Sequence, residues 1–270
     1  NKMTGAYEDY YRNGKVKSRG AYDDATRQTG TWTYYYETGI KAEERPMEKG
    51  KINGVRTNYF ENGKIKDRCG LVDGKPVGIM EYFHPNGAPA GTEKYRNGTL
   101  SEFGNQTDEN GNLTMQNGTG SLVRYHNNGR IQYTASYVNA KLDGRYTVYA
   151  SNGKLKSEIN YLSGQFHGAH RLFFTSGTLM EQSIYSYGKL QGRGDFYHPN
   201  GKLIGSVTYA NGELVRPEEF FDENGQPILR NGSGLFLSYN EQGKIATRIT
   251  YLDYCRNCLL YTSPSPRDRQ

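Results

Sequence analysis

Residues 144–164 read GRYTVYASNGKLKSEINYLSG, and this stretch decides the fold. Residues 145–149 combine β-branched and aromatic side chains, a composition typical of a strand. Residues 154–161 alternate between polar and mostly apolar side chains, which is the period of a strand with one solvated face. Between the two runs lies Asn152-Gly153, a dipeptide that favours a type I′ turn. The stretch therefore predicts one β-hairpin.

The second strand of this hairpin is predicted to carry two chemically different faces. Side chains alternate across a strand, so residues two apart share a face. This assigns Leu155, Ile159 and Tyr161 to the apolar face and leaves the charged side chains on the solvated face: Lys154, Lys156 and Glu158.

The hairpin is one unit of an internal repeat. Turn glycines recur at intervals of 24 residues, with a first interval of 25 and two intervals of 18, at Gly14, Gly39, Gly63, Gly87, Gly111, Gly129, Gly153, Gly177, Gly201, Gly225 and Gly243. The order of intervals also repeats after 114 residues, and residues 81–129 match residues 195–243 at 18 of 49 positions. A duplicated block of five units explains both periods.

These patterns predict an all-β protein. We expect an elongated antiparallel meander of about ten repeated hairpins in one open, solenoid-like sheet. The expected organisation is a first block of hairpin repeats at 1–129, a second block at 130–254, and a non-native or disordered tail at 255–270.

Composition narrows the classes of function. The chain of 270 residues is only 34% apolar but contains 24 tyrosines, so Tyr is expected to supply much of the buried area. The net charge of +6 is not concentrated in any run of like charges, and nucleic-acid binding is not predicted. No apolar run is long enough for a membrane-spanning helix.

The repeat resembles a known family. The consensus Y-x-x-N-G-K-[LI]-K-x-E is carried best by residues 149–158 and closely by residues 11–18 and 60–67. It is similar to the MORN-repeat variant of bacterial YwqK-type antitoxin proteins over about residues 5–251, with departures at 101–118 and 215–232. The resemblance implies a repeat fold and an antitoxin or immunity role. MORN-type repeats also imply structural or membrane-linked scaffolds.

The end of the chain breaks every column of the repeat. Residues 258–268 resemble the in-frame translation of a transposase-type sequencing adapter, so we expect the natural sequence to stop near Arg256 and the chain to be a fragment. Cys255 and Cys258 form a CxxC pair, but this reading removes Cys258 and with it the zinc or redox interpretation.

The aromatic column eight residues after the turn glycines is the candidate partner-binding site: Tyr137, Tyr161, Tyr185 and Tyr209. Tyr is favoured at protein interfaces, so such a row suits a binding platform. The competing interpretation is that these rings pack against one another and hold the sheet together. We predict no catalytic residue, no cofactor and no metal site, although His167 and His170 form an H-x-x-H pair for which Glu181 and Asp195 are candidate third ligands.

The sequence thus predicts a non-enzymatic repeat protein that binds a protein partner, such as a toxin, along a sheet face. The alternative is a structural or membrane- or envelope-associated scaffold, since the positive charge permits binding to anionic surfaces. No small-molecule substrate is expected. A cytoplasmic location is slightly favoured, and the envelope and secretion stay open because residue 1 is Asn.

Overall fold

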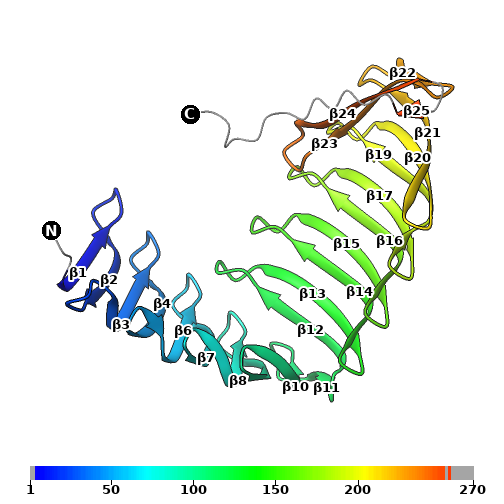
Figure 1. The fold of residues 1–270 in the computed structure, drawn as a ribbon. Coiled ribbons are helices and arrows are strands. Elements are labelled where there is room, and N and C mark those ends of the chain that lie inside the picture. The colour runs from blue at the N-terminus through cyan, green and yellow to red at the C-terminus, as the bar shows by residue number, and fades with distance from the viewer. Residues whose placement is uncertain (1–3, 253–254, 257–270) are drawn as a thin grey trace. The chain divides into compact units, whose positions relative to one another are not determined.

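The computed structural model describes residues 4–252 and 255–256. In this part of the chain there are 25 strands and no helix, and all strands belong to one antiparallel sheet. Strands pair antiparallel with the preceding strand, except that β5 and β6 both pair with β4 and β18 and β19 both pair with β17, so the sheet is an open meander of hairpins (Figure 1). The predicted all-β repeat fold is confirmed. Within the described residues no helix could span a membrane.

The strands of the first half are β1 (Gly5–Tyr10), β2 (Val16–Tyr22), β3 (Gln28–Tyr35), β4 (Lys41–Glu48), β5 (Lys51–Ile52), β6 (Gly54–Tyr59), β7 (Ile65–Val72), β8 (Lys75–Phe83), β9 (Pro89–Arg96), β10 (Thr99–Thr107), β11 (Leu113–Gln116) and β12 (Thr119–Tyr125).

The strands of the second half are β13 (Ile131–Val138), β14 (Lys141–Tyr149), β15 (Leu155–Leu162), β16 (Gln165–Phe173), β17 (Leu179–Ser186), β18 (Lys189–Leu190), β19 (Gly192–Tyr197), β20 (Leu203–Ala210), β21 (Glu213–Phe221), β22 (Pro227–Arg230), β23 (Ser233–Tyr239), β24 (Ile245–Leu252) and β25 (Cys255–Arg256).

The chain forms two compact units. Unit 1 comprises residues 1–132 and 136–141, and unit 2 comprises 133–135 and 142–270. The division into two repeat blocks at 1–129 and 130–254 concerns domain organisation and remains a prediction. Of the predicted tail, Cys255 and Arg256 form β25, which pairs with β24. Cys258 and the adapter-like segment lie outside the described residues.

The predicted type I′ turn at Asn152-Gly153 is wrong. Only Gly153 has a positive φ, at 85°. Its N–H donates to the carbonyl of Ala150 at 2.8 Å, and the N–H of Ala150 donates to the carbonyl of Lys154 at 2.8 Å. This is a three-residue loop with a glycine bulge. Asn152 keeps a negative φ because its Oδ1 accepts from the Lys154 N–H at 2.9 Å.

True type I′ turns lie at the opposite ends of the strands. Asn97-Gly98 has φ angles of 49° and 86°, and Asn211-Gly212 has 54° and 93°. Two kinds of turn therefore alternate along the meander. The three-residue turns occupy one edge of the hairpins and the two-residue turns the other.

Side chains of the three-residue turns donate to backbone carbonyls of the next such turn. We call these contacts the turn ladder. The amide of Asn13 donates to the carbonyl of Glu37 at 3.1 Å, and the hydroxyl of Tyr11 donates to that of Tyr35 at 2.6 Å. Lys15 donates to the carbonyl of Thr38 at 2.7 Å. The Asn and Lys of the consensus Y-x-x-N-G-K thus each join one hairpin to the next, and so does Tyr11, which stands one residue after the consensus Tyr position.

The ladder recurs along both units. Further asparagine contacts join Asn62 to Pro85 and Asn86 to Glu109, and further lysine contacts join Lys64 to Asn86, Lys154 to Ser176 and Lys202 to Glu223. Each donor is either a charged lysine or an asparagine with few rotatable bonds, and each acceptor is a backbone carbonyl. The spacing between successive turns is therefore set by the geometry of these hydrogen bonds rather than by the volume of packed side chains.

We predict that Asn13→Ala lowers the free energy of unfolding by about 1–2 kcal/mol, since it removes the ladder contact and the acceptor for the Lys15 N–H. Urea denaturation followed by circular dichroism measures the change. Arg12→Ala is the matched control, because the Arg12 side chain forms no hydrogen bond or ion pair among the described residues. Equal midpoints for the two variants would contradict the ladder.

A β-bulge follows each of these turns. In the hairpin of β14 and β15, Val148 opposes Ser157 and Tyr149 opposes Leu155, so Lys156 has no partner in the register. The predicted alternation is broken at this residue. Lys156 forms an ion pair with Glu241 at 3.1 Å, and its side chain is 48% exposed. A bulge adds one residue to a strand and interrupts its period of two.

Each 18-residue interval ends in a turn that reaches back across its own unit. We call residues 126–129 and 240–243 the closing turns. In unit 1 the N–H of Glu61 donates to the carbonyl of Asn127 at 2.8 Å, and in unit 2 the N–H of Thr175 donates to the carbonyl of Glu241 at 2.9 Å. Residues more than 60 positions apart are thereby joined in both units.

A buried histidine supports each closing turn. The Nε2 of His84 donates to the carbonyl of Thr107 at 2.9 Å, and its Nδ1 lies 2.9 Å from the hydroxyl of Tyr125. His198 makes the same two contacts 114 residues later, with Phe221 and Tyr239. Since a carbonyl only accepts, Nε2 is the donor in both of the histidine-to-carbonyl contacts.

The core beside the closing turn of unit 1 is polar. Arg124 pairs with Glu93 at 2.7 Å, with both side chains 9% exposed. Glu93 also accepts from the hydroxyls of Tyr82 and Tyr95, and Arg124 donates to Gln106 at 3.1 Å. The guanidinium of Arg124 lies 3.7 Å from the centre of the Tyr82 ring. Every charge in this network therefore has a partner, as a buried ion pair requires.

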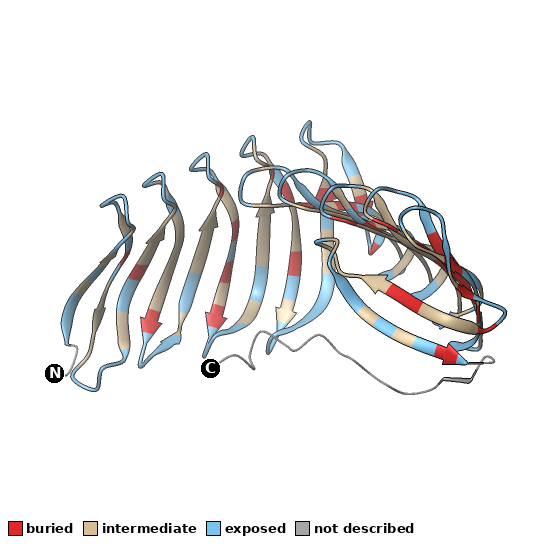
Figure 2. Ribbon diagram, turned by 90° about the horizontal axis from the view of Figure 1, so that it is seen from above, coloured by how far each residue is buried: buried red, intermediate tan, exposed pale blue. Residues whose placement is uncertain are grey.

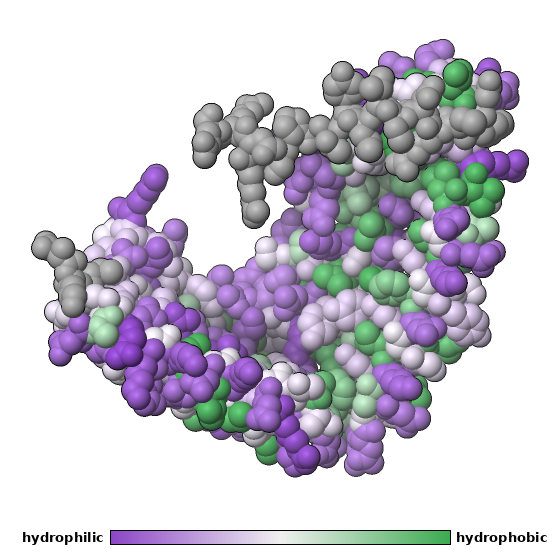
Figure 3. Space-filling view, viewed as in Figure 1, coloured by the Kyte–Doolittle hydropathy of each residue, from purple (hydrophilic) through white to green (hydrophobic). Residues whose placement is uncertain are grey.

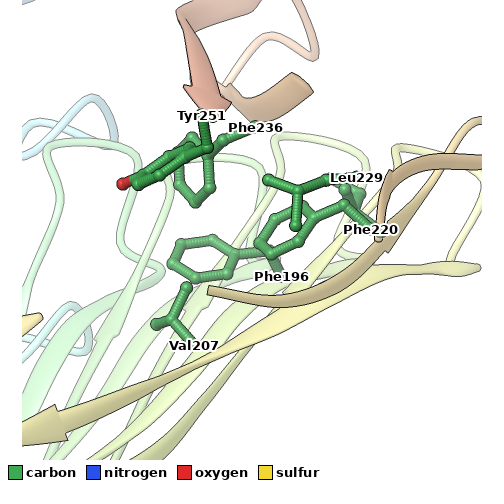
Figure 4. Close-up of a cluster of buried hydrophobic side chains, with 7 residues drawn as sticks. Phe196, Val207, Phe220, Leu229, Phe236 and Tyr251 are labelled. Carbon is green, nitrogen blue, oxygen red and sulfur yellow. The ribbon is translucent and has the colours of Figure 1, made fainter. Parts of the chain in front are cut away.

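Three of the four corresponding positions in unit 2 are apolar. Val207, Phe220, Ser238 and Phe196 stand 114 residues after Glu93, Gln106, Arg124 and Tyr82. They belong, apart from Ser238, to a cluster completed by Ile204, Leu229, Phe236 and Tyr251 (Figure 4). Elsewhere buried positions are spread along the strands while the turns are exposed (Figure 2). The same backbone arrangement thus encloses a polar core in unit 1 and a mainly apolar core in unit 2.

We predict that Arg124→Ser alone destabilises the protein by about 3–5 kcal/mol, because it leaves Glu93 buried without a counter-ion. The combined variant Tyr82→Phe, Glu93→Val, Gln106→Phe and Arg124→Ser copies unit 2 and should unfold at or above the wild-type urea concentration. A combined variant as unstable as the single one would show that the two cores are not interchangeable.

Candidate functional site

The register of unit 2 brings aromatic side chains to one face of the sheet. Tyr161 opposes Phe166, and Tyr185 and Tyr209 oppose glycines of the neighbouring strands. Tyr146 lies one strand earlier, opposite Ile159 on the same face. Opposed residues of an antiparallel pair share a face. We call the set Tyr146, Tyr161, Phe166, Tyr185 and Tyr209 the tyrosine face.

Neighbouring rings of the tyrosine face are in contact. The centroids of Tyr146 and Tyr161 lie 6.0 Å apart, those of Tyr161 and Phe166 5.1 Å, and those of Phe166 and Tyr185 5.2 Å. All five side chains are partly exposed, and Phe166 is 36% exposed. The rings thus pack against one another and still present area to a second molecule, which combines the two interpretations that the sequence left open.

Burial keeps these phenols neutral. It raises the pKa of Tyr209 to about 12 and also raises the pKa values of Tyr161 and Tyr185. A neutral phenol offers an O–H donor and an aromatic surface, so the face is suited to mixed polar and apolar contacts.

Three polar side chains on this face form no side-chain hydrogen bond or ion pair among the described residues: His170, Glu181 and Ser183. Glu181, Ser183 and Tyr185 alternate along β17, and His170 opposes Ser183. Ser183 is 2% exposed and its Oγ makes no hydrogen bond. Burial raises the pKa of Glu181 and lowers the pKa of His170. An unpaired carboxyl therefore lies beside Tyr185 and Tyr209, whose pKa values its charge raises.

The H-x-x-H pair is not a metal site. His167 and His170 are three positions apart on β16, so they point to opposite faces. His167 packs against Tyr187 with ring centroids 4.9 Å apart, while His170 contacts Tyr185. Within the described residues, no group of three or more His, Cys, Asp and Glu side chains could hold a metal ion.

Tyr137, the fourth predicted residue, belongs to unit 1. It is partly buried and packs against Phe103 with ring centroids 4.9 Å apart. Tyr161, Tyr185 and Tyr209 are brought together in unit 2, so the predicted column is divided between the two units. Its role in binding stays a prediction.

Sequence reasoning missed Tyr146 and Phe166 of the face and did not place Glu181 beside it. Phe166 lies outside the tyrosine column because it follows the two-residue turn rather than the three-residue turn. Glu181 was named only as a metal ligand, although its period-two spacing from Tyr185 places it on the apolar face. Figure 3 shows hydrophobic side chains gathered over the hairpins from β14 to β20.

Comparison with known proteins supports the repeat assignment. Residues 3–24, 28–49, 52–69, 142–162 and 188–211 match a family profile. The family that these five segments match is the MORN repeat variant. The MORN matches fall in both units, so the chain carries repeats of this kind in each of them. No curated protein matches the chain.

Two solved structures illustrate the remaining similarity. TcdB2-TccC3-TEV is 12% identical with a TM-score of 0.19, and TcdB2-TccC3 is 11% identical with a TM-score of 0.22. The alignments cover 91% and 95% of this chain but only 18% and 15% of those chains. TM-scores this low establish neither a shared fold nor a shared function.

We predict that Glu181→Gln raises the melting temperature at neutral pH. Because burial raises the pKa of Glu181, the folded chain binds more protons than the unfolded chain above the ordinary value of 4.5, and stability falls as pH rises through the raised value. The difference should vanish at about pH 3.5, where both states are protonated. Glu213→Gln, at an exposed carboxyl, is the control. A gain that persists at low pH would contradict this account.

Proposed function

We propose that the protein is a non-enzymatic scaffold that binds a protein partner on the tyrosine face of unit 2. The observation that carries the proposal is the row of partly exposed rings together with the unpaired carboxyl of Glu181, whose charge acts on Tyr185 and Tyr209. Aromatic side chains are enriched at interface cores and dominate their energetics. Four of the rings, those of Tyr146, Tyr161, Phe166 and Tyr185, contact one another in series.

The chemistry of the face favours a partner with a basic side chain. A lysine or arginine placed beside Glu181 gains a counter-ion and lies within reach of the rings of Tyr185 and Tyr209. Binding would return the Glu181 pKa toward its ordinary value, since a nearby cation favours the charged carboxylate.

The resemblance to the YwqK-type antitoxins suggests the biological role. We propose that the partner is a bacterial toxin and that the sheet neutralises it by covering part of its surface. The competing role is a structural or membrane-associated scaffold, for which the net charge of +6 is the relevant observation. No catalytic activity is proposed.

Sequencing of the locus with long reads would identify the neighbouring gene, whose product is the first partner to test. We predict that it co-purifies with the full chain and that Tyr161→Ala with Tyr185→Ala weakens the complex at least about tenfold, as loss of two interface aromatics implies. Titration calorimetry measures the affinity, and far-ultraviolet circular dichroism reports the fold.

Ile184→Ala is the matched control. Ile184 directly precedes Tyr185 on β17, so its side chain lies on the opposite face of the sheet, and it is 51% exposed. Equal loss of affinity in the control would contradict the proposed face. Loss of the β signal in the double variant would instead assign the tyrosines to packing. Binding to anionic vesicles with no toxin-like neighbour would favour the scaffold role.

A further inference from the structure

Unit 1 contains a cavity of about 460 Å³ that the proposed function does not use. Its walls include rings from two successive three-residue turns and two lysines at bulge positions, and the closing turn lies at one side: Tyr11, Tyr34, Tyr36, Lys17, Lys66 and Asn127. The cavity exists because the closing turn reaches back to the earlier hairpins through the Glu61–Asn127 hydrogen bond.

Lys66 is the unneutralised cation of this cavity. Its Nζ donates to Oδ1 of Asn127 at 2.7 Å, a neutral acceptor, and within the described residues it forms no ion pair. Lys17, by contrast, pairs with Asp9 at 3.3 Å. Burial lowers the pKa of Lys66. The charge of the neighbouring Asp67 acts in the opposite direction, and the Lys66 side chain is only partly buried. A bound anion would stabilise this cation, whose hydrogen-bond acceptor is a neutral amide.

Unit 2 carries a carboxylate at the closing position that Asn127 occupies in unit 1. Its lysine partner belongs to an earlier hairpin of its unit than Lys66 does of unit 1, since the counterpart of Lys66 114 residues later is Met180. The residue 114 positions after Asn127 is Glu241, and the two backbones make the same contact to an earlier turn. The carboxylate of Glu241 pairs at 3.1 Å with Lys156, which is also a bulge residue. Unit 2 therefore supplies its own carboxylate to a bulge lysine, whereas unit 1 offers only an amide.

The cavity also holds further hydrogen-bond donors. The Tyr34 hydroxyl oxygen accepts from the guanidinium of Arg45, so its O–H is left to donate. The Tyr35 hydroxyl forms no hydrogen bond among the described residues and also lines the cavity. The one carboxylate in the wall, Glu43, lies 3.7 Å from Arg45. Donors and positive charge thus outnumber acceptors around Lys66.

We propose that this cavity binds the carboxylate group of a ligand, which pairs with Lys66 in the way that Glu241 pairs with Lys156. The tyrosine rings of the wall contact the body of the ligand. The carboxylate is carried either by a small organic acid or by an acidic side chain of a peptide, and the volume admits both. The site is separate from the tyrosine face and does not depend on the function proposed for it.

Titration calorimetry of the full chain with glutarate tests the site, with glutaramide as the uncharged analogue. Glutarate should bind and glutaramide should not. Lys66→Met removes the cation, and Asn127→Glu installs the internal counter-ion of unit 2, so each should weaken glutarate binding at least about tenfold. Lys156→Met, in unit 2, should leave the affinity unchanged. A peptide with one glutamate, competing with glutarate, would assign the acidic side chain as the source.

Several outcomes would overturn the proposal. These are an absence of glutarate binding, wild-type affinity in both Lys66→Met and Asn127→Glu, and tighter binding of inorganic phosphate than of glutarate. Asn127→Glu keeps the backbone contact to Glu61, so its melting temperature separates loss of the site from loss of the fold. If that variant has the wild-type melting temperature and binds no glutarate, Lys66 is the anion-binding group.

Discussion

A hydrogen bond from a turn side chain to a carbonyl of the next turn is the interaction on which this structure depends. A sheet that is only 34% apolar has little hydrophobic area with which to fix the spacing of its hairpins. The turn ladder fixes it with contacts such as Asn13 to Glu37 and Lys15 to Thr38. The same contacts explain why the repeat is recognised by its turn residues rather than by its strands.

The 18-residue intervals add a second constraint, because each ends in a closing turn joined to a hairpin far back in its unit. The buried histidines His84 and His198 hold the two closing regions with identical contacts. The cores beside them differ, with the Glu93–Arg124 pair in one and an aromatic cluster in the other. The hydrogen bonds that hold the closing turns are the same in the two units, while the side chains that pack beside them differ. The cavity beside Lys66 in unit 1 and the tyrosine face in unit 2 are two further differences of this kind.

The fold follows from local signals, which is why the sequence predicts it. Glycine spacing and period-two alternation specify the hairpins without any long-range information. The turn at Asn152-Gly153 was mistaken because the Asn side chain caps its own turn, a choice that the dipeptide alone does not reveal. The closing contacts, such as Lys66 to Asn127, join residues 61 positions apart and leave no trace in local periodicity. The tyrosines of the candidate site were found from their column, but the unpaired state of Glu181 depends on tertiary packing.

The central claim is that the turn ladder holds successive hairpins together. Hydrogen exchange of asparagine side-chain amides, measured by NMR in the folded protein, tests it most directly. The ladder predicts slowed exchange for Asn13, Asn62 and Asn86, whose amides donate to the next turn, relative to Asn211, whose side chain forms no such contact. Equal exchange at all four residues would contradict the claim, because the turns would then be solvated independently of one another.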